Sequence, residues 1–187
     1  KKKIEHMNLG WEYKEPVLIY ISTDEVFGDI EQGFFKESDR HNPSNPYSAT
    51  KSSSEMLVKA WGRTYGIPYR ITRTTNNYGG RQHAEKLVPH TITQILKGEK
   101  VQVHGDGSYI RNWIYVKDNI DAVLKVLEEG KDGETYHISS DEEYSVLQIV
   151  EMIAKKFGKQ IEDVVEFIPN RSGQDLRYAL DSSKIKE

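Results

Sequence analysis

The feature that most constrains the fold is a short apolar run that ends abruptly in hydroxyls and carboxylates. Residues 16–22 read Pro-Val-Leu-Ile-Tyr-Ile-Ser, and Thr23, Asp24 and Glu25 follow directly. A nearly unbroken apolar run of this length is typical of a parallel strand buried on both faces. Open parallel sheets place their ligands at the carboxyl ends of the strands, so the polar cluster marks a candidate site.

A helix and a second strand are expected after this run. Residues 47–65 carry apolar side chains at helical spacing, and Gly66 is a typical helix terminator. Residues 68–72 have the pattern of another strand. Strand, helix and strand in this order predict an α/β fold with a parallel sheet and right-handed crossovers. The apolar positions of the helix are Met56, Leu57, Ala60 and Trp61.

Beyond residue 80 the chain alternates between short helices and short strands. We expect helices at 85–96, 117–127 and 145–157, and strands at 101–103, 113–116, 135–138 and 164–168. No internal repeat or low-complexity linker interrupts the sequence. We therefore predict two lobes that pack across a cleft, residues 1–80 and residues 81–187, with a soft boundary.

Composition excludes several classes of protein. The net charge of −3 gives no electrostatic reason to expect nucleic acid or an anionic membrane as a partner. No apolar run reaches the roughly 18 residues that a membrane helix needs. The sequence has no cysteine, which excludes disulfides and thiolate chemistry and is compatible with a reducing compartment. We expect a cytoplasmic enzyme or binding domain.

Tyr47 and Lys51 are the first candidate catalytic pair. They lie four residues apart and therefore on one face of the predicted helix. A cation beside a phenol favours the phenolate and lowers its pKa from the usual value of about 10. Such a phenolate can take the proton of a sugar hydroxyl when a nicotinamide accepts the hydride. The same spacing is also common on solvated helix faces, so the pair alone does not define a site.

Asp24 and Glu25 are the second candidate pair. A solvated loop with an Asx turn is the structural alternative for this stretch. Two adjacent carboxylates in a partly dry cleft repel each other, which raises the pKa of one and leaves one acid and one base. Their position at a strand end, about two dozen residues before Tyr47, favours a functional reading.

These motifs resemble the extended short-chain dehydrogenase/reductase superfamily, and within it the dTDP-glucose 4,6-dehydratases. The resemblance runs from about Val17 to the C-terminus, and the carboxylate pair distinguishes it from related epimerases and decarboxylases. It implies a partial Rossmann-type, doubly wound parallel sheet (the NAD-binding lobe, residues 1–80) with a smaller α/β substrate-binding lobe. Its motifs are residues 22–28 (Ser-Thr-Asp-Glu-Val-Phe-Gly), 47–51 (Tyr-Ser-Ala-Thr-Lys), 76–79 with 85–89, 104–107 with 111–116, and 171–175 with 177–178.

The resemblance implies a reaction in three steps on bound NAD. Tyr47 would take the C4 hydroxyl proton while the cofactor accepts hydride, and Thr23 would hydrogen-bond the C4 oxygen. Glu25 would then remove the C5 proton, and Asp24 would protonate the departing C6 hydroxyl. Hydride return to C6 would give a 4-keto-6-deoxy sugar. Lys51 would also hold the nicotinamide ribose.

The resemblance further implies a group of side chains that hold the cofactor and the nucleotide sugar. Arg111 and Arg171 would bind the diphosphate, a role that suits guanidinium groups, and His104 would stack on the base. By their sequence alone, His104 and both arginines could equally be solvated residues in turn-like loops. The implied cofactor contacts are Tyr47, Lys51 and Asn77, and the implied substrate contacts are Asn77, Glu85, Lys86, Leu87, His104, Arg111, Arg171 and Tyr178.

Two tryptophans and the remaining histidines carry no such implication. Trp61 and Trp113 fit packing better than ligand stacking. The other histidines lack the spacing of metal ligands, and we expect no metal.

The sequence departs from this family in one respect. The glycine-rich turn that receives the NAD pyrophosphate has no counterpart, and Gly10 stands alone. We expect the chain to be a portion of a longer protein; a naturally shortened homologue and a sheet completed by another chain are the alternatives. In complete members of this family several strands of the sheet lie upstream, and a sheet without those strands would expose an apolar edge.

Three functional hypotheses remain open at this stage. The first is a dTDP-glucose 4,6-dehydratase or its catalytic portion. The second is an epimerase or decarboxylase of the same superfamily that acts on a UDP or GDP sugar, and the third is a module that binds a nucleotide sugar without catalysis. We also expect a homodimer, formed through a helix face that includes Met56, Val58 and Trp61.

Overall fold

The computed structural model describes residues 16–187; residues 1–15 of the predicted first lobe, with Gly10, lie outside the described part. The main sheet contains three parallel strands in the order β1 (Leu18–Thr23), β2 (Tyr69–Thr74) and β6 (Thr135–Ile138). Leu18 pairs with Tyr69 and Ile71 pairs with Thr135, which fixes the register of the three strands.

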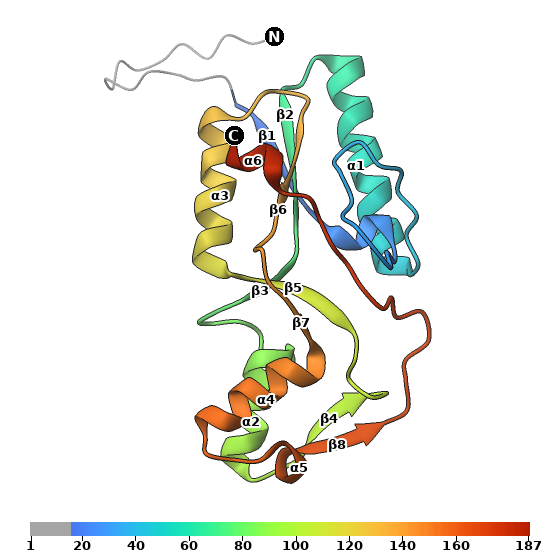
Figure 1. The fold of residues 1–187 in the computed structure, drawn as a ribbon. Helices are drawn as coiled ribbons and strands as arrows, with labels where there is room; N and C mark the ends of the chain where they lie inside the picture. The colour runs from blue at the N-terminus through green and yellow to red at the C-terminus, as the bar shows by residue number, and fades with distance from the viewer. Residues whose placement is uncertain (1–15) are drawn as a thin grey trace, which may run out of the picture.

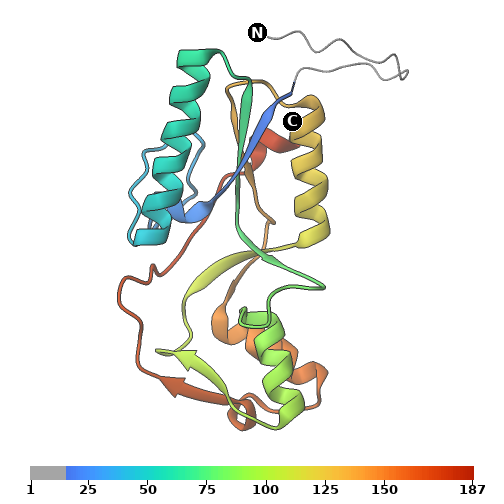
Figure 2. The ribbon, with the colours of Figure 1, turned by 180° about the vertical axis from the view of Figure 1, so that it is seen from behind.

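Two helices cover the main sheet from opposite sides, as Figures 1 and 2 show from front and back. Helix α1 (Pro46–Tyr65) packs on β1 and β2, and helix α3 (Val116–Glu129) packs on β2, β5 and β6. A parallel sheet with helices on both faces is the arrangement of a Rossmann-type fold. The predicted α/β class and partial doubly wound sheet are therefore confirmed.

A second region lies beyond the carboxyl ends of the main sheet strands (Figure 1). Here β5 (Ile110–Tyr115) pairs in parallel with β3 (Asn76–Tyr78) and antiparallel with β7 (Glu143–Ser145). The distal lobe consists of β4 (Val101–His104) paired with β8 (Val165–Ile168), and of α2 (Leu87–Lys97), α4 (Val146–Lys156) and α5 (Ile161–Val164). Its apolar core contains Ile95, Val101, Val103, Val150, Ala154 and Val164.

The chain crosses between the main sheet and the distal lobe more than once. Strand β6 comes from the segment after residue 80, yet it pairs with β2 of the first segment. Near the end of the chain, Leu180 bridges to Phe35, and α6 (Ser183–Lys186) packs on β6. A division at residue 80 stays a prediction, and these crossings show that the two segments share one sheet.

Helix α1 shows how local sequence sets an element and how packing overrides pattern. Asn45 caps its start, Pro46 is its first residue, and Gly66 ends it in the left-handed region at φ 66°. Its expected apolar positions do not face the sheet: Met56 and Leu57 are 59% and 60% exposed. Trp61 is also largely exposed and contacts Tyr65, so it packs on its own helix and not in the core.

The face of α1 that meets the sheet is polar and carries a buried charge pair. Glu55 is fully buried and accepts from Nε and Nη2 of Arg73 on β2 at 3.0 and 2.7 Å. Arg73 also bonds His137 Nε2 at 3.2 Å and His41 Nε2 at 2.8 Å. Its guanidinium lies 4.7 Å from the ring centre of Phe27. We call Glu55, Arg73, His137 and His41 the buried polar network.

Candidate active site

The end of β1 forms the turn expected to carry catalysis. Thr23 caps the short 3-10 helix η1 (Asp24–Phe27): its hydroxyl accepts from the Glu25 backbone N–H at 3.3 Å and donates to Asp24 Oδ1 at 3.1 Å. The turn ends at Gly28, with φ 75°, where an added Cβ would stand 2.4 Å from the carbonyl oxygen of Asn42. Glycine is required there, because another side chain would be both strained and clashing.

The environment of Asp24 brings the pKa of its carboxyl close to neutral pH. It is 3% exposed, and its Oδ2 has no hydrogen-bond partner. Burial first, and then the charge of Glu25, raise the pKa of Asp24 to about 7. A neutral carboxyl can donate a proton to a leaving hydroxyl, which is the acid half of the predicted pair.

Glu25 connects this turn to the start of α1. Asn45 Nδ2 donates to Glu25 Oε2 at 3.4 Å, and the Asn45 Oδ1 accepts from the Ser48 backbone at 2.9 Å. Tyr47 lies in the same first helical turn, and its side chain is 54% exposed. Glu25, Asp24, Thr23 and Tyr47 are therefore brought to one place at the carboxyl end of β1.

The predicted effect of Lys51 on Tyr47 is wrong for this structure. Lys51 Nζ donates to the Ile21 carbonyl at 2.6 Å and lies 4.6 Å from the centre of the Tyr20 ring. Burial, followed by the charges of Glu25 and Asp24, raises the pKa of Tyr47 instead of lowering it. The i, i+4 spacing places both residues on one helix, but the Lys51 ammonium donates to the backbone of β1.

Asn77 lies on β3, next to the end of the main sheet. Its amide nitrogen donates to Thr74 Oγ1 at 3.2 Å and to the Thr75 carbonyl at 3.0 Å. The amide oxygen of Asn77 is buried without a partner, so it can accept from a ligand hydroxyl or a water.

Glu85, Lys86 and Leu87 lie at the start of α2. Glu85 and Lys86 are exposed, and Lys86 Nζ lies 3.8 Å from Glu85 Oε1. Leu87 is half-buried against the distal lobe core.

His104 and Arg171 meet in the structure although 67 residues separate them. Arg171 Nε and His104 Nε2 are 2.6 Å apart, and His104 Nδ1 is 2.9 Å from the Pro169 carbonyl oxygen. Arg171 is exposed, so its remaining N–H groups are free for an anion.

Arg111 differs from its predicted setting. It belongs to β5 and is only 8% exposed, whereas the sequence suggested a turn-like loop. Its guanidinium donates to backbone carbonyls of Ile110, Leu176 and Asp175, and it lies 4.3 Å from the Tyr178 ring centre. The positive charge of Arg111 also acts on Asp24 and opposes the rise of its pKa. Arg111 therefore contacts Tyr178 and acts electrostatically on Asp24.

Several residues at the site carried no signal in the sequence. Ser44 and Asn45 join the turn after β1 to Asp175 of the 171–175 motif, and the buried polar network fixes α1 on β2. Their partners are far apart in the chain, so spacing rules cannot find them. An arginine directly after a predicted strand, such as Arg73 after residues 68–72, is the one indication that the sequence offers.

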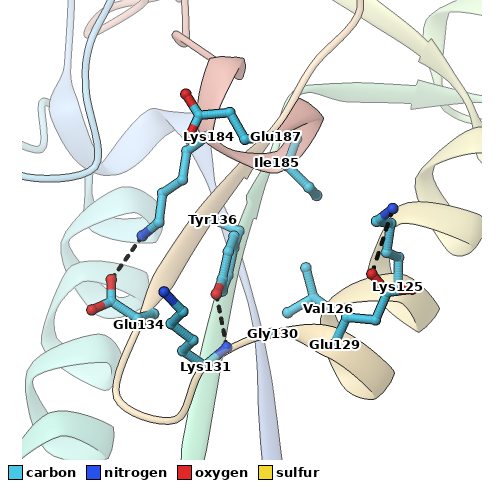
Figure 3. Close-up of a pocket in the computed structure, with 10 residues that line it drawn as sticks. All are labelled: Lys125, Val126, Glu129, Gly130, Lys131, Glu134, Tyr136, Lys184, Ile185 and Glu187. Atoms are coloured by element: carbon cyan, nitrogen blue, oxygen red, sulfur yellow. Dashed lines mark hydrogen bonds and ion pairs between the residues drawn. The ribbon is translucent and has the colours of Figure 1, made fainter.

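The hollow drawn in Figure 3 lies away from these residues. It encloses about 550 Å³ beside α3, α6 and the amino end of β6, and none of the predicted site residues lines it. Two ion pairs lie among its lining residues, Lys125 with Glu129, and Lys184 Nζ 2.8 Å from Glu134 Oε2. No helix in residues 16–187 has the length and apolarity to span a membrane, and those residues contain no group of three or more metal-ligating side chains.

A parallel sheet with helices on both faces and a Tyr-x-x-x-Lys helix are features of the NAD-dependent epimerase/dehydratase class of nucleotide-sugar enzymes. The Thr-Asp-Glu strand end is the feature that resembles its dehydratases. A family model described as GDP-mannose 4,6 dehydratase matches residues 4–187. The chain belongs to this family.

Relatives with assigned names support that membership. Low-salt glycan biosynthesis protein Agl12 of Haloferax volcanii is 49% identical over 168 residues, covering 90% of this chain and 54% of that protein. A dTDP-glucose 4,6-dehydratase of Haemophilus influenzae is 43% identical over 178 residues, covering 89% and 53%. The chain therefore spans about half the length of these relatives.

Solved structures agree with the fold. The dTDP-glucose 4,6-dehydratase DesIV of Streptomyces venezuelae, a double mutant with NAD bound, matches with a TM-score of 0.89 at 37% identity, covering 91% of this chain and 52% of that one. A UDP-glucuronic acid 4-epimerase of Bacillus cereus with NAD matches with a TM-score of 0.85 at 29% identity, covering 91% and 54%.

Proposed function

We propose that this chain carries the catalytic half of a dTDP-glucose 4,6-dehydratase, which converts dTDP-glucose to the 4-keto-6-deoxy sugar. One observation carries the proposal: a buried Asp24 with a pKa of about 7 lies beside Glu25, on a turn that meets the start of the Tyr47 helix. The proposal is supported by relatives that carry this name at about 40% identity or more.

The site residues divide the reaction between them. Tyr47 takes the C4 hydroxyl proton, and the Thr23 hydroxyl, which donates to Asp24 in this structure, would turn to donate a hydrogen bond to the C4 oxygen. Once C4 is a ketone, the C5 proton is acidic; Glu25 removes it, and returns a proton to C5 when hydride reaches C6. Asp24, protonated because burial disfavours its charged form, gives a proton to the departing C6 hydroxyl. In this structure, burial and the charges of Glu25 and Asp24 raise the pKa of Tyr47. Tyr47 therefore acts as a base only when a positive charge is added near its phenol or one of these negative charges is lost.

NAD fits the residues at the nicotinamide end of this proposed site. Tyr47 and Lys51 stand at the carboxyl end of β1, the position where parallel sheets receive dinucleotides, and Tyr47 remains half exposed. When bound, NAD would accept the hydride and return it. Lys51 and Tyr47 would hold its nicotinamide ribose, and Asn77 would contribute its unpaired amide oxygen to cofactor or substrate. The glycine-rich turn for the pyrophosphate has no counterpart in the sequence.

The nucleotide sugar is assigned to the side chains beyond the carboxyl end of the main sheet. His104 and Arg171, already in contact, would hold the base and a phosphate. Arg111 and Tyr178 would receive the diphosphate on the side nearer the carboxylates, and Glu85, Lys86 and Leu87 would line the glycosyl and ribose region. We also assign the protein to the cytoplasm, which the absence of cysteine favours.

The test is to incubate the purified chain with dTDP-glucose and NAD+ and to follow the alkaline absorbance of the 4-keto product. We expect product from the wild type and a loss of about 10²–10⁴-fold in Glu25→Gln, the usual contribution of a general base. Asp121→Asn, on the exposed face of α3, is the matched control and retains the wild-type rate. Undiminished product formation by Glu25→Gln would contradict the assignment.

Two alternatives have distinct outcomes in the same experiments. Recovery of a 4-epimer or a decarboxylated sugar from a UDP or GDP sugar would identify an epimerase or decarboxylase. The other alternative is a module that binds nucleotide sugar without catalysis. Binding of dTDP by calorimetry, with no binding of NAD+, would identify that module.

We further propose a homodimer formed through the exposed face of α1. Large apolar side chains gather on this helix, and contiguous exposed apolar surface on a helix commonly marks a protein interface. The residues are Met56, Leu57, Trp61 and Tyr65, each more than half exposed.

A further inference from the structure

Asp175 is a buried carboxylate at which two distant segments meet. It is 8% exposed, and its Oδ2 accepts hydrogen bonds from the Tyr178 hydroxyl, at 2.6 Å, and from the Ser44 hydroxyl. Ser44 lies 131 residues earlier in the chain. We call Asp175, Ser44, Tyr178 and Arg111 the Asp175 cluster. A buried carboxylate needs such donors, and here both use the same oxygen.

On one side, the cluster touches the start of the catalytic helix. Ser44 directly precedes Asn45, the N-cap of α1, whose side chain donates to Glu25 at 3.4 Å. The Asn45 oxygen is simultaneously fixed by the Ser48 backbone at 2.9 Å. A displacement of Ser44 therefore acts on Asn45, and through it on Glu25.

On the other side, the cluster touches residues assigned to the nucleotide sugar. Arg111 Nη2 donates to the Asp175 carbonyl at 2.8 Å, and its guanidinium covers the Tyr178 ring at 4.3 Å. Arg171, in contact with His104, lies four residues before Asp175 on the same loop. A ligand that draws Arg111 or Tyr178 toward itself must change the bonds that reach Asp175.

Charges of both sides act across the cluster. After burial and the bond to Asp175, the charge of Glu25 is the next cause that raises the pKa of Tyr178. The charge of Arg111 opposes the rise in the pKa of Asp24. The carboxylates of the catalytic turn are therefore within electrostatic reach of the residues that would bind the diphosphate.

A purely structural role is the alternative, since a buried carboxylate can serve only to tie one loop to another. The oxygen atom that both donors share, Asp175 Oδ2, indicates a role beyond joining two loops. Because Ser44 and Tyr178 donate to the same Oδ2, a change in one bond alters the other.

We propose that Asp175 is a positioning residue, through which occupancy of the nucleotide-sugar site is transmitted by Ser44 and Asn45 to Glu25. The inference rests on the proposed function for the identity of the ligand. It places the alignment of the C5 base under the control of bound substrate.

The experiment uses the whole 187-residue chain with ¹³C-labelled glutamate, and dTDP as the probe. The Glu25 carboxyl resonance is identified by its loss in Glu25→Gln. Spectra with and without dTDP are compared for wild type, Ser44→Ala, Ser44→Thr and Ser54→Ala. Ser54 is the matched control, because its hydroxyl donates to Thr50 within the same helix.

We expect dTDP to move the Glu25 resonance in wild type, Ser44→Thr and Ser54→Ala. In Ser44→Ala more than half of this movement is lost, while the dissociation constant for dTDP stays within about threefold of wild type. A structural role alone would not separate binding from the response of Glu25. Full movement in Ser44→Ala overturns the inference, and so does a wild-type resonance that stays in place with dTDP bound.

Failure of dTDP to bind the wild type contradicts the nucleotide proposal separately. The spectra without ligand then decide the inference. We expect the Glu25 resonance of Ser44→Ala to differ from that of wild type, Ser44→Thr and Ser54→Ala. Coincident resonances in all four proteins overturn it.

Discussion

The main sheet and the distal lobe are each stabilised by a different kind of interaction. Between α1 and β2, the fully buried Arg73 and Glu55 form a two-point ion pair at 2.7 and 3.0 Å. The distal lobe instead packs aliphatic side chains, with Val101 and Val150 fully buried. Directional bonds specify one position of the catalytic helix, whereas apolar packing specifies volume and tolerates adjustment.

The buried polar network also contacts the turn after β1. Arg73 lies over Phe27, the last residue of η1, and also bonds His137 and His41. Burial, and then Arg73, lower the pKa of His137 to about 3 and also lower that of His41. Both rings are therefore neutral at pH 7 and can accept from the guanidinium. One arginine thus holds the helix of Tyr47 and the turn of Asp24 in a fixed relation.

The largest expected effect is the loss of Arg73. Arg73→Met leaves the buried Glu55 carboxylate without its two-point partner, and the Lys59 ammonium at 3.9 Å offsets this only in part, so the loss is about 3–5 kcal/mol of unfolding free energy. Val150→Ala, the matched change in the distal lobe, removes two methyl groups and costs about 2 kcal/mol. Urea unfolding at pH 7 measures both.

The double variant Arg73→Met/Glu55→Leu sharpens this test. Replacing both members of a buried ion pair by apolar residues is often nearly neutral, so more than half of the lost stability returns. If Arg73→Met proves no more harmful than Val150→Ala, the distinction between the two regions is wrong.

The second effect concerns Asp24 and depends on pH. Its pKa is about 7 in the folded protein against an ordinary value of 3.8, so the native state binds the proton more tightly than the unfolded chain. The stability from the neutral carboxyl is complete below pH 3.8 and is lost as pH rises through 7. Asp24→Asn, which keeps the site neutral, is therefore expected to exceed wild type at pH 8 by on the order of 3 kcal/mol.

At pH 4 the same substitution is expected to have little effect, because Asp24 is then neutral in the folded protein. The exposed Asp121→Asn serves as a control and changes stability by about 0.5 kcal/mol or less at either pH. Denaturant unfolding at the two pH values measures the difference. Equal effects of Asp24→Asn at pH 4 and pH 8 would show that the carboxyl is not held neutral by the fold.

The sequence predicted elements well where the signal was local. The apolar run before Thr23 became β1, and Gly66 and Ser145 mark a helix end and start as expected. The pairing of β2 with β6 could not be read, because about 60 residues separate the strands and parallel pairing leaves no short-range mark.

The candidate site was predicted in part for the same reason. Asp24 and Glu25 are adjacent in sequence, so their mutual repulsion could be anticipated. The position of the Lys51 ammonium could not be anticipated, because its bond to the Ile21 carbonyl depends on how α1 lies over β1. Arg111 was placed in a loop because the Gly-Asp-Gly turn before it obscured the strand, and Ser44 meets Asp175 only in three dimensions.

The smallest expected effect on chain stability comes from the exposed face of α1, which belongs to neither core. Trp61 is 53% exposed, so Trp61→Glu is expected to change the unfolding free energy of the monomer by about 0.5 kcal/mol or less. If that face joins two copies, the same charge is buried without a partner in the dimer, and association is lost. Sedimentation at micromolar concentration should give a dimer for wild type and a monomer for Trp61→Glu. Leu96→Glu, an exposed apolar position on α2 of the distal lobe, should remain dimeric, so a monomeric wild type or a dimeric Trp61→Glu would remove α1 as the interface.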